Sequence, residues 1–430
     1  MSALSPSCLL LQWKYEFKID TKIAVFFLAL LIVSLTAGLV GSLLTVLIHF
    51  IQELSLGFQE GNFSQTITQT LPLRRVISLT LAGLLAGFGW YTLAKQNKPL
   101  VPISTVVLDN HIMYSRVNFI HGMLQLITVS MGSPVGREGA SREVTVALSD
   151  AWIEKTPSII RDKRNTLLAC ASGAALGAVY NAPFATTIFI LETILISWKF
   201  KDILATTFSS FIAVFVVRLL LGDDIQYSLP LLQFNASLLI WSIFAGIFIA
   251  LLAFGYQFAL KKIPKRQLNE KSFILRALFA FLLVGVLSLY FPQILGNGKA
   301  GILFILHEKP SFIYALALFL AKAIAVWLVF FSGAYGGKIA PAMMLGGTVY
   351  ALFAVLWNIS PLPVVSLPFA IVIGAAVFLG LLNQMPLTAI LFLPEITNQP
   401  FYNAIPIAIA VLSGLLVYKK LAKTELHPKS

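Results

Sequence analysis

The sequence predicts an all-helical, multi-spanning membrane protein built from two inverted repeats of tilted and partly broken helices. Three observations carry this prediction: a very apolar composition, several stretches long enough to cross a bilayer, and a glycine- and proline-marked pattern that occurs twice. Hydrophobic residues make up 58% of the 430 residues and charged residues only 11%. Soluble domains carry about 25% charged residues, so this composition indicates a membrane protein.

The candidate spans are long apolar stretches. A helix needs about 20 mostly apolar residues to cross the hydrocarbon core of a bilayer. Stretches of about that length or longer occur at 23–50, 76–94, 203–221, 238–260 and 312–331. We expect each of them to form a membrane helix, with the lipid bilayer as a partner.

Basic residues gather in some of the gaps between the apolar stretches and are missing from others. The formal net charge is +13, but we expect no nucleic-acid partner, because the position of these charges suits a membrane protein. Loops rich in lysine and arginine favour the cytoplasmic side, and the segments that carry them are 14–22, 95–98, 155–164, 199–201, 261–266 and 419–423. Segments 55–70 and 222–235 contain neither residue and suit the outside. Arg74, Arg75, Lys299 and Lys309 break this trend.

This charge pattern predicts the order of the segments. We expect a cytoplasmic N-terminal segment over 1–22, a transmembrane domain over 23–421 and a short cytoplasmic tail over 422–430. Both termini then lie inside the cell, and the protein is a multi-pass protein of the plasma or inner membrane.

An internal repeat divides the transmembrane domain. Residues 172–189 resemble residues 373–392, and a glutamate follows or ends each copy, at Glu192 and Glu395. A glycine-led break precedes each copy at the same separation, 37 residues from Gly136 to Gly173 and from Gly337 to Gly374. The halves are then about 23–231 and 232–421. The first copy ends in a basic segment and the second in a segment without lysine or arginine, so the halves run in opposite directions, as in many transporters.

Three segments predict helices that begin inside the membrane: 98–102, 136–140 and 337–341. The first N–H groups of a helix lack partners within it, and this end carries about half a positive charge. Glycine lets the backbone approach a ligand closely, so such an end binds anions. Backbone without helical structure is tolerated at membrane depth only where it is buried or lines a cavity. We therefore expect the three segments to converge on one anion.

Glu138 is the leading functional residue, because an ionisable side chain inside a membrane marks a functional site by default. An ionised carboxylate beside an anion site can occupy that site as a tethered competitor and leave when it is protonated or displaced. Glu138 would then be a gate. The alternative is a structural ion pair with Arg137 or Arg142.

These motifs resemble the CLC family of chloride channels and anion/proton antiporters. The family motifs G-S-G-I-P, G-[KR]-E-G-P and G-x-F-x-P correspond in order to segments 98–102, 136–140 and 337–341, and the Asn181-Ala-Pro183 start also matches. The resemblance covers about 23–421. It implies two inverted halves of broken helices, a homodimer, and one anion pathway in each subunit.

The resemblance also implies the site residues. Glu138 is the expected gate, and the expected anion-binding residues are Pro99, Leu100, Val101, Gly136, Arg137, Glu138, Gly139, Gly337, Lys338, Ile339 and Ala340. Glu138 is also expected in the proton pathway.

Several positions depart from the family pattern. The anion-contacting serine of the family falls at Pro99, as in members that favour nitrate, and the internal proton glutamate falls at Thr193, next to Glu192. The family's anion-coordinating tyrosine has no counterpart. Lys338 would raise the local positive potential or extend toward water.

The expected function is transmembrane transport of chloride or a similar small inorganic anion, gated by Glu138. One alternative is a proton-coupled exchanger of chloride, nitrate or fluoride. Another is a non-transporting relative that acts in sensing or assembly. An enzyme is not expected, because no nucleophile, base and orienting residue occur together at recognisable spacing. The five histidines and two cysteines show no metal-ligand spacing, and no metal or other cofactor is expected.

Overall fold

The computed structural model describes residues 21–57, 67–96, 98–223, 225–233, 236–264 and 268–426. Residues 1–20 of the expected N-terminal segment and 427–430 of the expected tail lie outside the described residues. The last described helix continues to Leu426, so the described part of the expected tail is helical.

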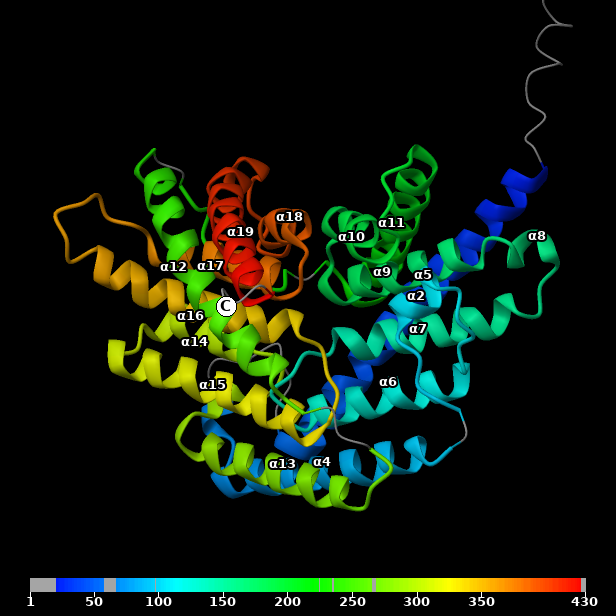
Figure 1. Cartoon of the computed structure of the whole chain (residues 1–430), viewed down its shortest axis with the longest axis horizontal. Coiled ribbons are helices and arrows are strands. Elements are labelled where there is room, and N and C mark those ends of the chain that lie inside the picture. The colour runs from blue at the N-terminus through cyan, green and yellow to red at the C-terminus, as the bar shows by residue number, and fades with distance from the viewer. Residues whose placement is uncertain are drawn as a thin grey trace, which may run out of the picture.

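The regular elements of these ranges are helices (Figure 1). In chain order they are α2 (Thr21–Leu56), α4 (Pro72–Ala94), α5 (Ile103–Leu108), α6 (Ser115–Ser130), α7 (Glu138–Ile153), α8 (Ser158–Arg161), α9 (Arg164–Tyr180), α10 (Pro183–Phe189), η2 (Ile190–Ile194), α11 (Phe200–Leu221), α12 (Ala236–Lys261), α13 (Ser272–Tyr290), η3 (Pro292–Ile294), α14 (Lys299–Glu308), α15 (Phe312–Ser332), α16 (Ile339–Trp357), α17 (Leu367–Leu382), α18 (Pro386–Ile396), η4 (Phe401–Asn403) and α19 (Ala404–Leu426).

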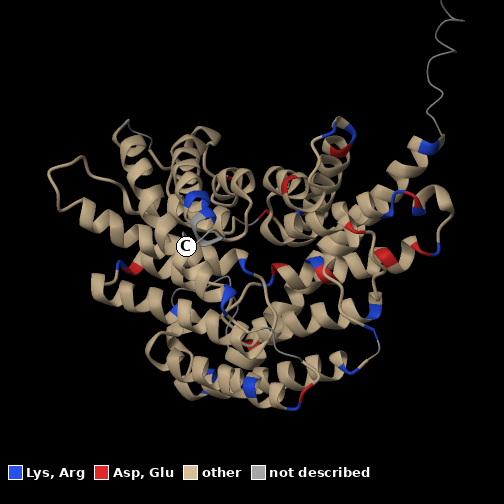
Figure 2. Ribbon diagram, viewed as in Figure 1, with Lys and Arg blue, Asp and Glu red and all other residues tan. Residues whose placement is uncertain are grey.

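The predicted all-helical membrane class is confirmed. Within the described part of the chain, eight helices are long and apolar enough to cross a membrane. The five apolar stretches singled out in the sequence fall in α2, α4, α11, α12 and α15. Most charged residues lie in loops and at helix ends, and a small group lies near the centre of the molecule (Figure 2).

The sequence repeat corresponds to a repeated structure. A left-handed residue follows α9 at Asn181 (φ 57°), and another follows α17 at Gln384 (φ 55°). Two residues later a proline begins the next helix, Pro183 in α10 and Pro386 in α18. Proline suits the first turn of a helix because its fixed φ is helical and it lacks the N–H that would have no partner there.

The glutamate that follows each copy of the repeat forms hydrogen bonds with the other copy. Glu395 accepts the N–H groups of Phe184 at 2.8 Å and Ala185 at 2.6 Å, in the first turn of α10. Glu192 accepts the two N–H groups in the first turn of α18, at 2.9 and 2.8 Å. A carboxylate at a helix N-terminus offsets its partial positive charge. Each copy therefore supplies the charge that caps the broken helix of the other.

Long-range packing joins the first and second parts of the chain elsewhere as well. Helices α4 and α13 lie side by side at the bottom of the view in Figure 1. Gly83 and Gly87 of α4 lie against the backbone and side chains of α13. Small residues at a helix interface let two membrane helices approach closely. This packing joins a helix of the first half to a helix of the second.

Candidate functional site

The starts of α7 and α16 meet at a two-residue antiparallel bridge. The N–H of Gly136 donates to the carbonyl of Gly337, and the N–H of Gly337 donates to the carbonyl of Gly136, both at 2.8 Å. Helix α7 begins two residues after Gly136 and α16 two residues after Gly337. Two helix N-termini, one from each half, therefore point into one small region.

The carboxylate of Glu138 fills that region. The side chain is 1% exposed, and its Oε1 accepts the N–H of Ile339 at 2.6 Å. A Cβ added at Gly136 or Gly337 would overlap this carboxylate. The close approach therefore requires glycine at both positions. The carboxylate takes a backbone donor of the opposite helix, the kind of donor that binds anions at helix N-termini.

A cavity of about 410 Å³ adjoins the two helix starts. Its walls come from the segment before and at the start of α5, from α6, from η2 and from the segment before α16. The predicted residues that line it are Leu100, Glu138, Gly139, Thr193, Gly337, Lys338 and Ile339. All three predicted break segments thus contribute to one cavity.

The other predicted site residues lie elsewhere. Gly136 forms the bridge, and Ala340 is buried in the first turn of α16. Pro99 lines a neighbouring cavity. The carbonyl of Val101 accepts a hydrogen bond from the Asn118 side chain at 3.0 Å.

A second cavity, of about 300 Å³, lies next to Arg137. Its lining includes Lys299 and, from the end of α11 and the loop that follows, Gly222 and Ile225. Consecutive residues of one chain segment, Arg137 and Glu138, thus line two different cavities. Glu138 itself lines the first cavity and not the second.

Arg142, one of the two arginines that the ion-pair alternative named, contacts the side chains of Ser172 and Phe189. The Nε–H of Arg142 donates to the hydroxyl of Ser172 at 2.9 Å, and its guanidinium lies 4.9 Å from the centre of the Phe189 ring. The Lys338 ammonium lies 5.2 Å from the centre of the Phe330 ring, within cation–π distance.

Sequence reasoning did not assign several polar lining residues of the first cavity to the site, among them His121, Gln125, Glu143 and Tyr335. His121 and Gln125 are four residues apart on α6, which puts them on one face of the helix. That spacing was visible in the sequence. The cavity they face was not, because it is formed by segments far apart in the chain.

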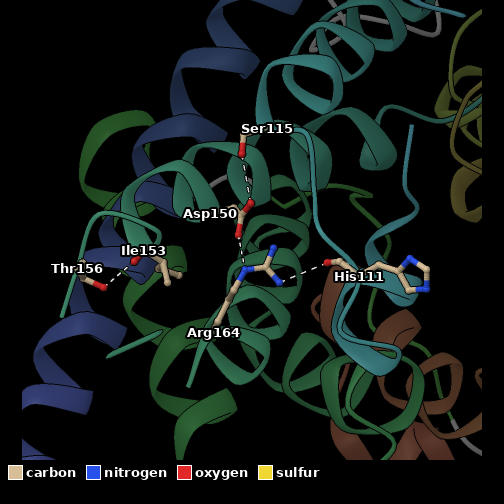
Figure 3. A network of polar contacts seen from close by, with 6 residues as sticks. All are labelled: His111, Ser115, Asp150, Ile153, Thr156 and Arg164. Atoms are coloured by element: carbon tan, nitrogen blue, oxygen red, sulfur yellow. Dashed lines mark hydrogen bonds and ion pairs between the residues drawn. The ribbon is translucent and has the colours of Figure 1, made fainter. Parts of the chain in front are cut away.

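An ion pair anchors the other end of α7. The Nε–H of Arg164 donates to Asp150 at 2.7 Å, and the Asp150 side chain is fully buried. Ser115 donates to the second oxygen of the same carboxylate at 3.2 Å (Figure 3). These contacts join α7 to the first residues of α6 and α9, and so position the start of α7 at the cavity.

Two helix N-termini and a buried carboxylate meet beside a cavity inside a multi-spanning helical protein, an arrangement suited to binding an anion within a membrane. The sequence profile of the family described as "Voltage gated chloride channel" matches residues 82–419, more than half of the chain. The chain belongs to this family, the CLC family, and CLC-type anion transport is its class of activity.

Relatives and solved structures agree with this membership. A Vibrio campbellii protein named "H(+)/Cl(-) exchange transporter ClcA" is 28% identical over 95% of this chain and 89% of its own length. An Escherichia coli protein named "Voltage-gated ClC-type chloride channel ClcB" is 26% identical over 87% of this chain and 91% of its own. The fold resembles a slow cyanobacterial Cl-/H+ antiporter, with a TM-score of 0.77, 18% identity and coverage of 92% and 94%. It also resembles a CLC-type fluoride/proton antiporter, with a TM-score of 0.67, 17% identity and coverage of 94% and 97%.

Proposed function

We propose that this protein moves chloride or a similar small inorganic anion across the membrane through a pathway that the Glu138 carboxylate closes. The observation that carries the proposal is the hydrogen bond from the Ile339 N–H to Glu138 at 2.6 Å. The carboxylate occupies the place where a backbone donor at a helix start would hold an anion. The anion and the carboxylate therefore compete for the same binding position.

Opening follows from this competition. An anion that enters from the first cavity must displace the carboxylate, since the carboxylate already fills the space beside Gly136 and Gly337. Protonation of Glu138 also vacates the binding position, because a neutral carboxyl group is attracted less to the helix N-terminus than a carboxylate is. The gate is thus sensitive to both anion concentration and pH.

The first test replaces Glu138 with glutamine. Glu138→Gln keeps the shape of the side chain and removes its charge, so we expect chloride flux in liposomes that stays high and nearly independent of pH. The control is Glu154→Gln, an exposed glutamate just after the end of α7, which should retain the wild-type pH profile. A Glu138→Gln protein with the wild-type pH dependence would contradict the gate.

Proton-coupled exchange is the second candidate, and Glu143 favours it. This glutamate lines the same cavity as Glu138, five residues or about 7.5 Å further along α7. It accepts a hydrogen bond from the Asn118 side chain at 2.8 Å. Thr193, which lines the cavity as well, cannot carry a proton as a carboxylate does. Glu143 supplies a second carboxylate on the route between the cavity and the gate.

Exchange predicts that a chloride gradient drives proton movement in liposomes. Glu143→Gln should then abolish the proton movement and leave chloride flux. Proton movement that persists in this variant would exclude Glu143 from the route, and its absence in the wild type would favour a channel. Competition among chloride, nitrate and fluoride in the same assay identifies the anion. Absence of flux under any gradient would favour the non-transporting alternative of a sensor or assembly protein.

We also propose that the protein is a homodimer in the plasma or inner membrane, with both termini in the cytoplasm and an independent pathway in each subunit. The family resemblance and the pattern of basic loops support this arrangement. The mass of the purified protein in detergent, measured by light scattering and corrected for bound detergent, tests the subunit number. A monomeric mass would contradict the dimer.

A further inference from the structure

Three buried side chains form a hydrogen-bonded chain that ends at the first cavity. The indole N–H of Trp90, on α4, donates to Nδ1 of His121 at 3.0 Å. Nε2 of His121 lies 2.6 Å from the nitrogen of the Gln125 side-chain amide, and which amide atom faces the ring depends on the His121 tautomer. Exposed fractions are 1% for Trp90, 3% for His121 and 4% for Gln125. The amide of Gln125 is therefore held by its neighbours, whereas an exposed glutamine would rotate.

This chain determines where the protons are. An indole N–H can only donate, so Nδ1 of His121 is the acceptor and the imidazole is neutral, with its proton on Nε2. Nε2–H must donate to Gln125. A glutamine amide can lie in two orientations, which the hydrogen-bond network distinguishes. The donor from His121 selects the orientation with the Gln125 oxygen toward the ring and the NH2 group away from it.

The NH2 group then points at the helix starts. The far atom of the Gln125 amide would lie 2.6 Å from a Cβ added at Gly139, and the same Cβ position lies 3.7 Å from the backbone nitrogen of Gly337. Gln125, Gly139 and Gly337 all line the first cavity. A fixed N–H donor thus lies beside Gly139, in the first turn of α7, and near the backbone of Gly337, just before α16.

Other polar side chains of the cavity have different hydrogen bonds. The Thr193 hydroxyl donates to the carbonyl of Phe189 at 2.6 Å. The Asn383 amide donates to the carbonyl of Leu379 at 3.2 Å. Gln125 differs from these two side chains, because its donor group is held in place and faces the starts of α7 and α16.

We propose that the side-chain NH2 of Gln125 binds the transported anion directly, and that Trp90 and His121 are positioning residues that hold it in the donating orientation. The inference rests on the proposed anion pathway and adds a side-chain ligand to it. By the family resemblance, Pro99 stands where the family has an anion-contacting serine, so the chain has no hydroxyl there. Gln125 supplies a donor from a different helix. The ligand class is a small monovalent anion.

The test measures chloride affinity separately from the maximum rate. Gln125→Met keeps the size of the side chain and removes the donor. We expect the chloride concentration at half-maximal flux to rise about tenfold, the effect of losing one hydrogen bond to a charged group, while the maximum rate changes less than twofold. Gln125→Glu should weaken chloride more, by placing a negative charge at the anion. The control is Gln52→Met, a glutamine that is 7% exposed on α2.

Trp90→Phe tests the positioning role. It removes the N–H and keeps an aromatic ring, so His121 no longer has a fixed tautomer and chloride affinity should fall. If Trp90 acts through Gln125, the double variant with Gln125→Met should bind chloride no more weakly than Gln125→Met alone. Additive effects would indicate a separate structural role for Trp90 and overturn this part of the inference.

Calorimetric titration with chloride separates the two proposals, because it needs no transport. Suppose that the wild-type protein binds chloride but does not transport it, and that Gln125→Met binds chloride more weakly. This result would support Gln125 as an anion ligand and overturn the proposed transport function. Suppose instead that the wild-type protein transports chloride, and that Gln125→Met and Gln125→Glu keep its chloride affinity and its half-saturating chloride concentration. This result would overturn the role of Gln125 as a ligand and leave the transport function intact.

Discussion

Glu138 and two glycines form the smallest functional unit of this protein. The carboxylate reaches a donor on the opposite helix only because Gly136 and Gly337 have no side chain. The same space is the expected seat of the anion. In the proposed function, gate and ion therefore use one volume, and displacement of a single side chain would open the pathway.

Gly337→Ala tests this shared volume. The added Cβ would overlap both the carboxylate and the anion, so we expect chloride flux to fall at least tenfold, and the additional change Glu138→Ala should not restore it. If the glycine mattered only to the carboxylate, removing the carboxylate would restore flux. Liposome flux measures both variants. Gly255→Ala is the control, since a Cβ there meets no atom within 4 Å.

The sequence could predict Glu138 at this scale, but not its polar neighbours. An ionisable residue between glycines in an apolar chain is conspicuous, and its position at the start of a helix suggests a role in anion binding. His121 and Gln125 lie in a helix with other polar residues, such as Asn118 and Thr128. Their importance depends on Trp90, which lies on another helix and was not identifiable as a partner from spacing.

At the scale of elements, α7 is anchored at both ends. Its first residue contacts α16, and near its last turn Asp150 pairs with Arg164 at 2.7 Å and accepts from Ser115 (Figure 3). A charge without a partner in a buried site is costly, so the Asp150 pair constrains where α7 can lie. Contacts at both ends therefore fix the position of the helix that carries the proposed gate.

Asp150→Asn should destabilise the protein by about 3 kcal/mol, because it leaves the Arg164 charge without its carboxylate in a largely buried site. Thermal unfolding in detergent, followed by circular dichroism, measures the effect. The double change with Arg164→Gln should regain part of the loss. Asp223→Asn is the control. Its partner Arg218 lies 3.3 Å away and both side chains are exposed, so its effect should stay below about 1 kcal/mol. Equal losses in the two single variants would contradict the anchoring role.

At the scale of the whole molecule, the repeat explains the site. The equal spacing of 37 residues between glycines predicted two equivalent helix starts, and these starts are the ones that meet at the bridge of Gly136 and Gly337. The sequence could not predict that Glu192 and Glu395 each cap the other copy. Contacts between residues about 200 positions apart leave no local pattern.

Lys299 shows how structure accounts for an exception in the charge pattern. A lysine in a segment assigned to the outside weakens the orientation argument, yet Lys299 lines the second cavity together with Arg137. Positive side chains around the mouth of a cavity raise the local concentration of anions. The positive charge of Lys299 therefore suits an anion pathway. Its presence does not require that segment 299–309 face the cytoplasm.

Cysteine labelling tests the orientation of the two cavities. In a background with Cys8→Ser and Cys170→Ser, a cysteine at Ser228 should react with a membrane-impermeant maleimide on intact cells, because it lies in the 222–235 loop beside the second cavity. A cysteine at Lys163, in a basic segment assigned to the cytoplasm, should react only after the membrane is opened. Both positions are exposed, so access to the reagent decides the result. The reverse pattern would invert the proposed topology, and labelling of both in intact cells would exclude a membrane between them.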